Sequence, residues 1–432
     1  MILAMLMSAA YADQYYVELP TQGIANSHQI TVPVYAENPV IPGVNPVTGE
    51  AMTVPYTPVM ASVDNEPAGL PQWGVGKAAI TYELPLYKSG PTRLLVMFAG
   101  DDTPIWVGPL RSIRMPWIGF RQMWDAAIAF SGEPEDTSQK AGQQMRKQVI
   151  PREYIQDVMP QAYQGGRWQF PFFAEHQGNY MGHFLRYGEG KQYVHKNSGD
   201  MVLKYNEILP YFTRESIAHP FLFGNGLDHG IDVSHLNITY QNKEYVVDYY
   251  YDPLSRKYVR WRNGSESYDL ETGMPLEYDN VIIVRTTITW PIEGNRPVID
   301  QVGQGTAEIF QNGLFIRGAW VRTHAQQADE YQSMNSRMIF LDDYGNELVM
   351  RPGKTFIQVV QNEQPVLVET NTMIQGAKAQ ATPKPTATPK PTRVPKATRT
   401  PKPGRGGQQM QQPQVQVTPI PEEEEVEFTF GG

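Results

Sequence analysis

RLLVMFA at residues 93–99 and GPLRSIR at residues 108–114 are the two stretches around which the expected fold is built. The first is an almost unbroken apolar run, which is typical of a buried strand. The second precedes residues 115–123, which we predict to be helical, and its proline suits a first helical turn. Arg111 and Arg114 would then share one helix face. Because free N–H groups and guanidinium groups both attract anions, we predict an anion-binding site here.

Further polar residues are expected beside these arginines. Asp64 and Asn65 follow a strand predicted at 59–63, and in sheets with parallel strands ligands bind beyond the carboxyl ends. Glu83 and Arg93 lie at the ends of neighbouring predicted strands, where they would form an ion pair across the sheet or act in the site itself. The residues predicted to bind ligand are Asp64, Asn65, Gln72, Glu83, Arg93, Arg111, Ser112 and Arg114.

The sequence leaves structural alternatives open for these residues. Arg111 and Arg114 would equally well pair with Asp or Glu of the same chain. Asp64 and Asn65 would equally well form an Asx turn. We expect Ser112 to bond backbone or ligand as a helix-start hydroxyl. It has no Lys or His nearby in the sequence to activate it as a nucleophile.

The first half of the chain predicts strands alternating with helices. Apolar runs at 78–83 and 125–130 are strand candidates, whereas polar stretches at 137–150 and 152–159 are rich in helix formers. Strands that alternate with helices favour an α/β arrangement with some parallel pairing. We therefore expect an N-terminal α/β domain with a mixed sheet.

The second half predicts an antiparallel β domain, so the fold class is α+β. Its short runs are rich in β-branched and aromatic residues, and Asn263-Gly264 and Asn312-Gly313 are strong hairpin signals. The tyrosines at 245 and 249–251, near Trp261, would face opposite sides of a strand in alternation. Inward rings would pack the core, and outward rings would suit sugar stacking or a protein partner.

The two ends of the chain differ from its body. Residues 2–10 are apolar and Ala10-Tyr11-Ala12 resembles a signal-peptide cleavage site, so we expect export. The near-repeats at 381–386 and 387–392 predict a disordered, semi-rigid Pro/Thr/Lys stalk before an acidic tail. The expected parts are a signal-like segment at 1–12, an extended segment at 13–57, an α/β domain at 58–233, a β-rich domain at 234–375, and the stalk and tail at 376–432.

Composition excludes several classes of protein. The chain has 432 residues, no Cys and a net charge of −9. Without Cys there is no disulfide framework, thiolate metal site or lipid-anchor position. A body this acidic is a poor nucleic-acid binder, and the apolar start is too short to span a bilayer. Neither Asp228-His229 with Asp232 and His235, nor Glu175-His176 with His183, has metal-motif spacing, so we predict no metal or other cofactor.

Several separated motifs resemble the YerB-like family of extracytoplasmic bacterial lipoproteins, over roughly residues 45–362. They are Asp64-Asn65-Glu66, Leu70-Pro71-Gln72-Trp73-Gly74, Ala79-Ile80-Thr81-Tyr82-Glu83, Gly90-Pro91-Thr92-Arg93, Val107 to Arg114, Tyr258-Val259-Arg260, Asp269 to Gly273, Asn280 to Val284 and Arg351 to Phe356. The resemblance implies two domains of unknown function outside the cytoplasm and supplies no activity. The family's lipobox Cys is absent from this chain.

These observations favour an exported, non-enzymatic cell-envelope protein that binds an anionic wall polymer or a glycan through its N-terminal domain. Two alternatives stay open. In a hydrolase of a wall glycan or anionic polymer, Asp64 or Glu83 would serve as general base while the arginines held a negative group. In a protein-interaction module, the exposed tyrosine face would bind a protein partner. The sequence does not determine the oligomeric state.

Overall fold

The computed structural model describes residues 14–25, 36–130 except Ser89, 218–240, 245–292, 296–322 and 337–379, together with short strands between residues 155 and 204. The signal-like segment, the expected helix at 137–150 and the tail beyond residue 379 lie outside the described residues. The described part of the chain contains one α-helix, α1 (Met115–Met123), and is otherwise built mainly from strands.

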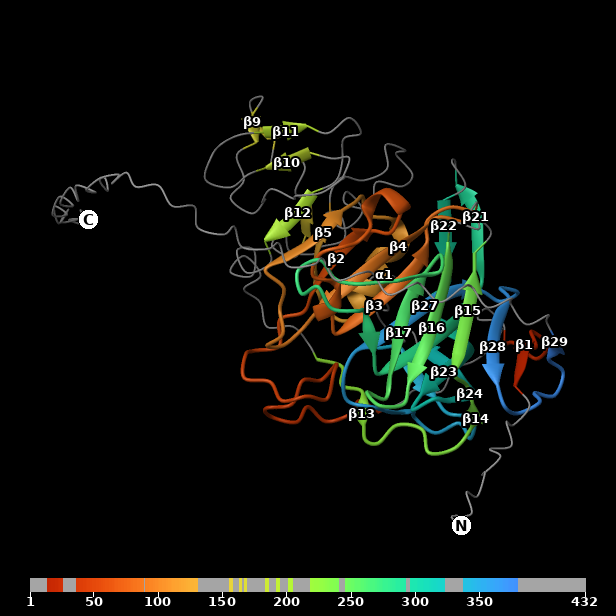
Figure 1. The fold of residues 1–432 in the computed structure, drawn as a ribbon. Coiled ribbons are helices and arrows are strands. Elements are labelled where there is room, and N and C mark those ends of the chain that lie inside the picture. Colours follow the sequence, from red (N-terminus) through yellow and green to blue (C-terminus); the bar gives the residue numbers. More distant parts are fainter. Residues whose placement is uncertain are drawn as a thin grey trace, which may run out of the picture. The chain divides into compact units, whose positions relative to one another are not determined.

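Thirteen described strands form one large mixed sheet (Figure 1). They are β2 (Val59–Asp64), β3 (Ile80–Pro85), β4 (Thr92–Phe98), β5 (Trp106–Leu110), β6 (Ala127–Phe130), β7 (Ile155–Asp157), β12 (Met201–Lys204), β14 (Ile231–Asp232), β20 (Asn280–Thr286), β23 (Gly303–Gln311), β24 (Leu314–Arg322), β25 (Ile339–Leu341) and β27 (Thr355–Gln361). The main path runs β12-β5-β2-β4-β3-β27-β20-β23-β24-β14.

One strand of the second half joins the two halves of the chain. β27 lies between β3 and β20 and pairs in parallel with both. Its neighbour β3 pairs antiparallel with β4, as β20 does with β23. Strands from both halves therefore share one continuous sheet.

A second sheet covers one face of the large sheet. Its eight strands are β1 (Tyr15–Glu18), β15 (His235–Thr239), β16 (Val246–Asp252), β17 (Lys257–Arg262), β18 (Ser265–Glu266), β19 (Glu277–Tyr278), β28 (Val366–Thr370) and β29 (Lys378–Ala379). Val96 of β4 belongs to the same buried cluster as Leu236 of β15 and Val247 of β16. The two sheets thus enclose one apolar core.

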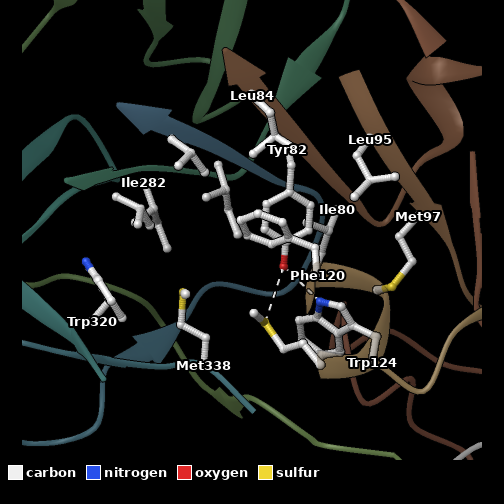
Figure 2. Close-up of a cluster of buried hydrophobic side chains, with 14 of the residues drawn as sticks. Ile80, Tyr82, Leu84, Leu95, Met97, Phe120, Trp124, Ile282, Trp320 and Met338 are labelled. Atoms are coloured by element: carbon white, nitrogen blue, oxygen red, sulfur yellow. Dashed lines mark hydrogen bonds between the residues drawn. The ribbon is translucent and has the colours of Figure 1, made fainter. Parts of the chain in front are cut away.

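Helix α1 covers the opposite face of the large sheet. Figure 2 shows Phe120 and Trp124 packing against Tyr82 of β3. The rings of Tyr82 and Phe120 are 4.8 Å apart, and the Trp124 indole N–H donates to the Tyr82 hydroxyl at 2.8 Å. This bond satisfies two polar groups inside an apolar cluster, where an unpaired donor would be costly. We call the two sides of the large sheet the α1 face and the second-sheet face.

Four smaller strand pairs complete the described secondary structure. β21 (Ile288–Ile292) pairs antiparallel with β22 (Arg296–Ile299), which contacts α1. β13 (Leu222–Phe223) pairs in parallel with β26 (Val349–Met350). The remaining pairs are β8 (Tyr163–Gln164) with β9 (Arg167–Trp168), and β10 (His183–Leu185) with β11 (Gln192–Val194).

The helix prediction at 115–123 and the mixed sheet are confirmed, but the described part of the first half is mainly strands with one α-helix, which does not correspond clearly to the expected α/β domain. Pro109 lies in β5, and Pro116 is the proline of the first helical turn. β7 occupies part of 152–159, where helix was expected, because helix-forming composition is a weak preference that sheet pairing overrides. Within the described residues no helix is long and apolar enough to cross a membrane.

Both predicted hairpin turns are confirmed. Asn312 and Gly313 connect β23 to β24 as a two-residue loop with φ values of 57° and 75°. Asn263 and Gly264 connect β17 to β18 with φ values of 50° and 77°. Two consecutive positive φ values are what a type I′ turn requires, and Asn-Gly adopts them most easily.

Candidate functional site

Strand alternation divides the predicted site residues between the two faces of the large sheet. Asp64 at the end of β2 lies directly opposite Arg93 of β4, and Arg93 lies opposite Leu84 on the α1 face. Glu83, one residue before Leu84, points to the second-sheet face, opposite Gln358 of β27. The predicted residues therefore form two clusters rather than one.

The expected ion pair between Glu83 and Arg93 is wrong for this reason. On the α1 face, Arg93 lies 3.9 Å from Asp64 Oδ1 and 3.7 Å from Glu66 Oε1. Arg111 donates from Nε to Asp64 Oδ2 at 3.1 Å. Asp64 is completely buried and also accepts from the Glu66 backbone N–H at 3.1 Å, which is the Asx-type contact left open by the sequence.

Arg114 differs from the other two arginines because it contacts no carboxylate of the described residues. Its guanidinium donates to the Ile113 carbonyl at 3.0 Å and to the Tyr87 hydroxyl at 3.4 Å. Its Nε atom is buried without a hydrogen-bond partner. Burial, with the nearby charges of Arg93 and Arg296, lowers the pKa of Arg114 to about 10. A positive charge is held here against an unfavourable environment.

We call Arg93, Arg111, Arg114 and Arg296 the arginine cluster. The Ser112 carbonyl accepts from Arg93 at 3.1 Å and from Arg114 at 3.4 Å, so a backbone oxygen joins two of the guanidinium groups. Among the described residues, Ser112 forms its hydrogen bonds through this carbonyl and not through the hydroxyl expected from the sequence. Arg296, on β22, was not predicted, because it lies 182 positions after Arg114 in the sequence.

The helical placement of Arg111 and Arg114 is wrong. Helix α1 begins at Met115, and Arg114 is its extended N-cap residue. The backbone N–H of Arg111 donates to the Ser62 carbonyl at 2.8 Å, continuing sheet-like pairing beyond β5. The two arginines therefore meet through a short extended connection between β5 and α1, not along one helix face.

On the second-sheet face, Glu83 is the centre of a buried polar network. One carboxylate oxygen accepts from Thr92 at 2.7 Å and from Asn65 at 3.0 Å. The other accepts from Arg260 of β17 and from Gln358 of β27, each at 2.9 Å. Burial alone raises the pKa of Glu83, but Arg260, Thr92 and Arg262 outweigh it, so the net pKa lies below its usual value.

Asn65 and Gln72 connect this network to the arginine cluster. Gln72 donates to the Asp64 carbonyl at 2.9 Å and to Asn65 Oδ1 at 3.1 Å. Arg262 of β17 donates to the same Asn65 oxygen at 2.9 Å and lies 4.8 Å above the Tyr245 ring. Burial, partly offset by Glu83, lowers the pKa of Arg262 to about 10. We call Asn65, Glu83, Thr92, Arg260, Arg262 and Gln358 the inter-sheet network.

The sequence did carry a signal for the arginines of the inter-sheet network. Tyr258, Arg260 and Arg262 alternate along β17 and all point into the core between the sheets. Two arginines at inward-facing strand positions predict buried anionic or carbonyl partners. That pattern does not identify Glu83 as the partner of Arg260, since these two residues are 177 positions apart.

The tyrosine group is divided as strand alternation predicts. Tyr245 and Tyr249 are buried in the core between the sheets, whereas Tyr250 is 42% exposed on the outer face. The Tyr250 ring stacks on His235 at 4.3 Å, with 8° between the planes. One face of the Tyr250 ring is therefore covered by another ring.

The histidine groups considered in the sequence make local pairs. His229 contacts Asp228 at 3.0 Å and Asp343 at 2.8 Å, and His235 contacts Asp248 at 2.8 Å. Within the part of the chain that the structure describes, no three His, Asp or Glu residues group as a metal site would require. The side chains of Glu175, His176 and His183 are outside the described residues.

Two family models together match more than half of the chain. The model described as "Protein of unknown function (DUF3048) N-terminal domain" matches residues 47–216, and the corresponding C-terminal domain model matches residues 236–357. The expected resemblance to YerB-like proteins is confirmed by these matches and by the relative described next.

One relative comes from Bacillus subtilis (strain 168) and is named "Putative lipoprotein YerB". It is 26% identical over 321 residues, which cover 73% of this chain and 85% of the relative. The crystal structure of YerB protein from Bacillus subtilis superposes with a TM-score of 0.54 and 22% identity, covering 73% of this chain and 96% of that one. At this identity the structural match shows a shared fold.

Proposed function

The chain belongs to the DUF3048 family of proteins of unknown function, and from its arginine cluster we propose that it binds an anionic ligand outside the cytoplasm. The ligand class is an anionic wall polymer or an anionic glycan. The protein acts by binding rather than by catalysis.

The observation that carries this proposal is the environment of Arg114. Its charge is buried beside Arg93 and Arg296, and the contacts that offset it are carbonyl and hydroxyl oxygens. The described acids near the cluster, Asp64 and Glu66, are engaged by Arg93 and Arg111. A phosphate or carboxylate that approached Arg114 would supply the missing negative charge and accept paired N–H bonds from the guanidinium fork.

The geometry favours binding over the hydrolase alternative. Asp64 and Glu83 are both completely buried, and guanidinium groups contact both carboxylates. A general base needs a proton acceptor within reach of a water or a substrate hydroxyl. Glu83 instead uses both oxygens for contacts within the protein.

An extracytoplasmic location is supported by two separate observations. The B. subtilis relative is named "Putative lipoprotein YerB", and lipoproteins are anchored on the outer side of a membrane. The small-residue pattern Ala10-Tyr11-Ala12 after an apolar run is typical of an export signal. Protease added to intact cells should digest the protein at the same rate as a known surface protein. Full protection until lysis would contradict this location.

Anion binding is tested by thermal unfolding of the full chain with increasing inorganic phosphate and pyrophosphate. We expect both anions to raise the unfolding midpoint of the wild type and pyrophosphate to do so at lower concentration. Arg114→Met and Arg296→Met should each abolish the response. Lys378→Met is the matched control, because it removes one positive charge from a side chain that is 76% exposed.

The outcomes distinguish anion binding at the arginine cluster from a general effect of the anions on the charge of the protein. If Lys378→Met loses the response as completely as Arg114→Met, the anions act on the net charge and the proposal is wrong. If the wild type does not respond to either anion, the proposal is also wrong. Arg114→Lys keeps the charge but loses the guanidinium fork, and we expect it to retain part of the response.

A further inference from the structure

We propose that the outer face of the second sheet is a docking surface for a basic peptide segment of a partner protein. The outer face is the side of the second sheet that points away from the large sheet. The inference goes beyond the proposed function, because it concerns neither the arginine cluster nor an anionic ligand. Three features of this face carry it: a row of aromatic rings, an excess of carboxylates around the rings, and a polar hollow beside them.

Four rings form a row across the outer face. The ring of Tyr16 on β1 lies parallel to that of His235 on β15, with their centroids 6.2 Å apart. His235 stacks in turn on Tyr250 of β16 at 4.3 Å. Tyr250 meets Trp261 of β17 edge to face, at 5.5 Å. We call Tyr16, His235, Tyr250 and Trp261 the aromatic row.

The aromatic row presents ring surface to solvent. Tyr250 is 42% exposed, and Tyr16 and Trp261 are half-buried. The inward-facing tyrosines of the same sheet, Tyr249 and Tyr258, are completely buried. Tyr and Trp are enriched among the residues that carry most of the binding energy in protein interfaces. The aromatic row therefore supplies the apolar centre of a docking surface.

Carboxylates surround the aromatic row. Residues that pair across strands share one face of a sheet, and this pairing places six carboxylates but only two ammonium groups on the outer face of the described strands. The acids are Glu18, Asp248, Asp252, Glu266, Glu277 and Glu369, and the lysines are Lys257 and Lys378. Burial, with the charges of Asp248 and Glu369, raises the pKa of Tyr16 to about 12. Carboxylates that hold a phenol protonated would also attract a cation.

Lysine and arginine side chains match the rings and the carboxylates at once. Their head groups pair with carboxylates and lie favourably over the faces of Trp and Tyr rings, and their aliphatic stems cover apolar surface. An acidic segment would be repelled by this face. A purely apolar segment would bury carboxylates without a partner, which is costly.

The length of the aromatic row favours a peptide over a small cation. β1 and β17 are separated by four strand spacings, which amount to about 19 Å. An extended segment of about six residues covers that length. A single ammonium or guanidinium ion would contact only one part of the row.

A polar hollow adjoins the Tyr16 end of the aromatic row. It has a volume of about 240 Å³ and is lined by Gln14, Asp232, Ser234, Thr370 and Asn371. Ser234 directly precedes His235, and Thr370 directly follows Glu369. Carboxylate, hydroxyl and amide oxygens all accept hydrogen bonds from ammonium and guanidinium groups. The head group of one Lys or Arg of the docked segment would occupy this hollow.

The experiment measures binding of four synthetic hexapeptides to the full chain by isothermal titration calorimetry. Hexa-arginine and hexalysine are the basic probes, hexaglutamate is the acidic one, and a Gly-Ser repeat is the neutral one. We expect the two basic peptides to bind and the other two not to bind. Trp261→Ala should weaken hexa-arginine binding by about tenfold. Glu369→Gln and Asp232→Asn should each weaken it by about threefold.

Three control variants should leave hexa-arginine binding unchanged. Tyr344→Ala removes a tyrosine that is 74% exposed and lies beside His229, outside the aromatic row. Glu50→Gln removes one exposed negative charge from the loop before β2. Arg114→Met changes the arginine cluster, which lies on the α1 face of the large sheet. If Trp261→Ala does not fold, Tyr250→Ala tests the same row and should also weaken binding.

The failures of the inference are specific. If Glu50→Gln weakens binding as much as Glu369→Gln, the peptides respond to net charge and the inference is wrong. It is also wrong if the neutral peptide binds as tightly as the basic ones, or if no basic peptide binds the wild type. Unchanged affinity in both Trp261→Ala and Tyr250→Ala would place the peptide elsewhere and overturn it. None of these outcomes bears on the phosphate response that tests the anion site.

Discussion

Glu83 of β3 accepts a hydrogen bond from the Arg260 guanidinium of β17 at 2.9 Å, across the core between the two sheets. Both side chains are almost completely buried, with exposed fractions of 0% and 1%. The bond connects a strand of the first half of the chain to a strand of the second half. The position of one half against the other thus depends on a charge pair as well as on apolar packing.

We predict that removing one charge of this ion pair lowers the free energy of unfolding more than removing both charges together. Glu83→Gln and Arg260→Met should each lower the free energy of unfolding by about 3–5 kcal/mol, because each leaves one charge buried without its partner. The double variant Glu83→Gln with Arg260→Met should lose less than either single change. Urea denaturation of the four proteins checks this order, and additive losses would contradict it.

The pH dependence of the unfolding free energy should report the titration of the Glu83 carboxylate. The pKa of Glu83 is lowered in the folded protein from its usual value of 4.5, so its stabilising effect is present above that value and lost as the pH falls through the folded pKa. The difference in unfolding free energy between wild type and Glu83→Gln should therefore be constant above about pH 5.5. It should shrink at lower pH. A difference that grows on acidification would show that Glu83 has a raised pKa.

Local features of this fold could be predicted from the sequence, because local chemistry determines them. The helix at 115–123 and the turns at Asn263-Gly264 and Asn312-Gly313 depend on residues next to one another. The assignment of strands in the second half rests on the same short-range pattern. The weak helix preference of 152–159 misled the fold class, because pairing of β7 with β6 decides that segment.

The candidate site could be predicted only in part. Asp64, Arg93 and Arg111 do meet, since strand ends and the following loops bring them together. Glu83 was assigned to the same site because the sequence does not show register. With β3 and β4 paired so that Leu84 opposes Arg93, Glu83 must face the other way. Arg260 and Arg296 come from distant strands, and no spacing rule relates them to Glu83 or Arg114.

The Asn312-Gly313 turn offers a stability prediction with a matched control. Gly313→Ala and Gly264→Ala both place a side chain at a positive φ, 75° and 77°, which should cost about 1 kcal/mol. A Cβ at Gly313 would lie 2.6 Å from the Tyr251 ring, whereas nothing lies within 4 Å of one at Gly264. Gly313→Ala should therefore be the more destabilising in urea denaturation. Equal losses would show that Tyr251 moves away at no cost.

Arg114 and Arg260 are both buried arginines, but replacing Arg260 should destabilise the protein far more than replacing Arg114. Arg260 pairs with Glu83, whereas Arg114 has carbonyl and hydroxyl partners and lies near two other guanidinium groups. Arg260→Met leaves a carboxylate unpaired, whereas Arg114→Met removes a like-charge repulsion together with its hydrogen bonds.

We expect Arg114→Met to stay within about 1 kcal/mol of the wild-type free energy of unfolding. The same variant should lose the stabilisation by phosphate. That combination would support a role of Arg114 in binding rather than in stability. A loss as large as that of Arg260→Met, measured in urea without phosphate, would instead make the arginine cluster a structural element.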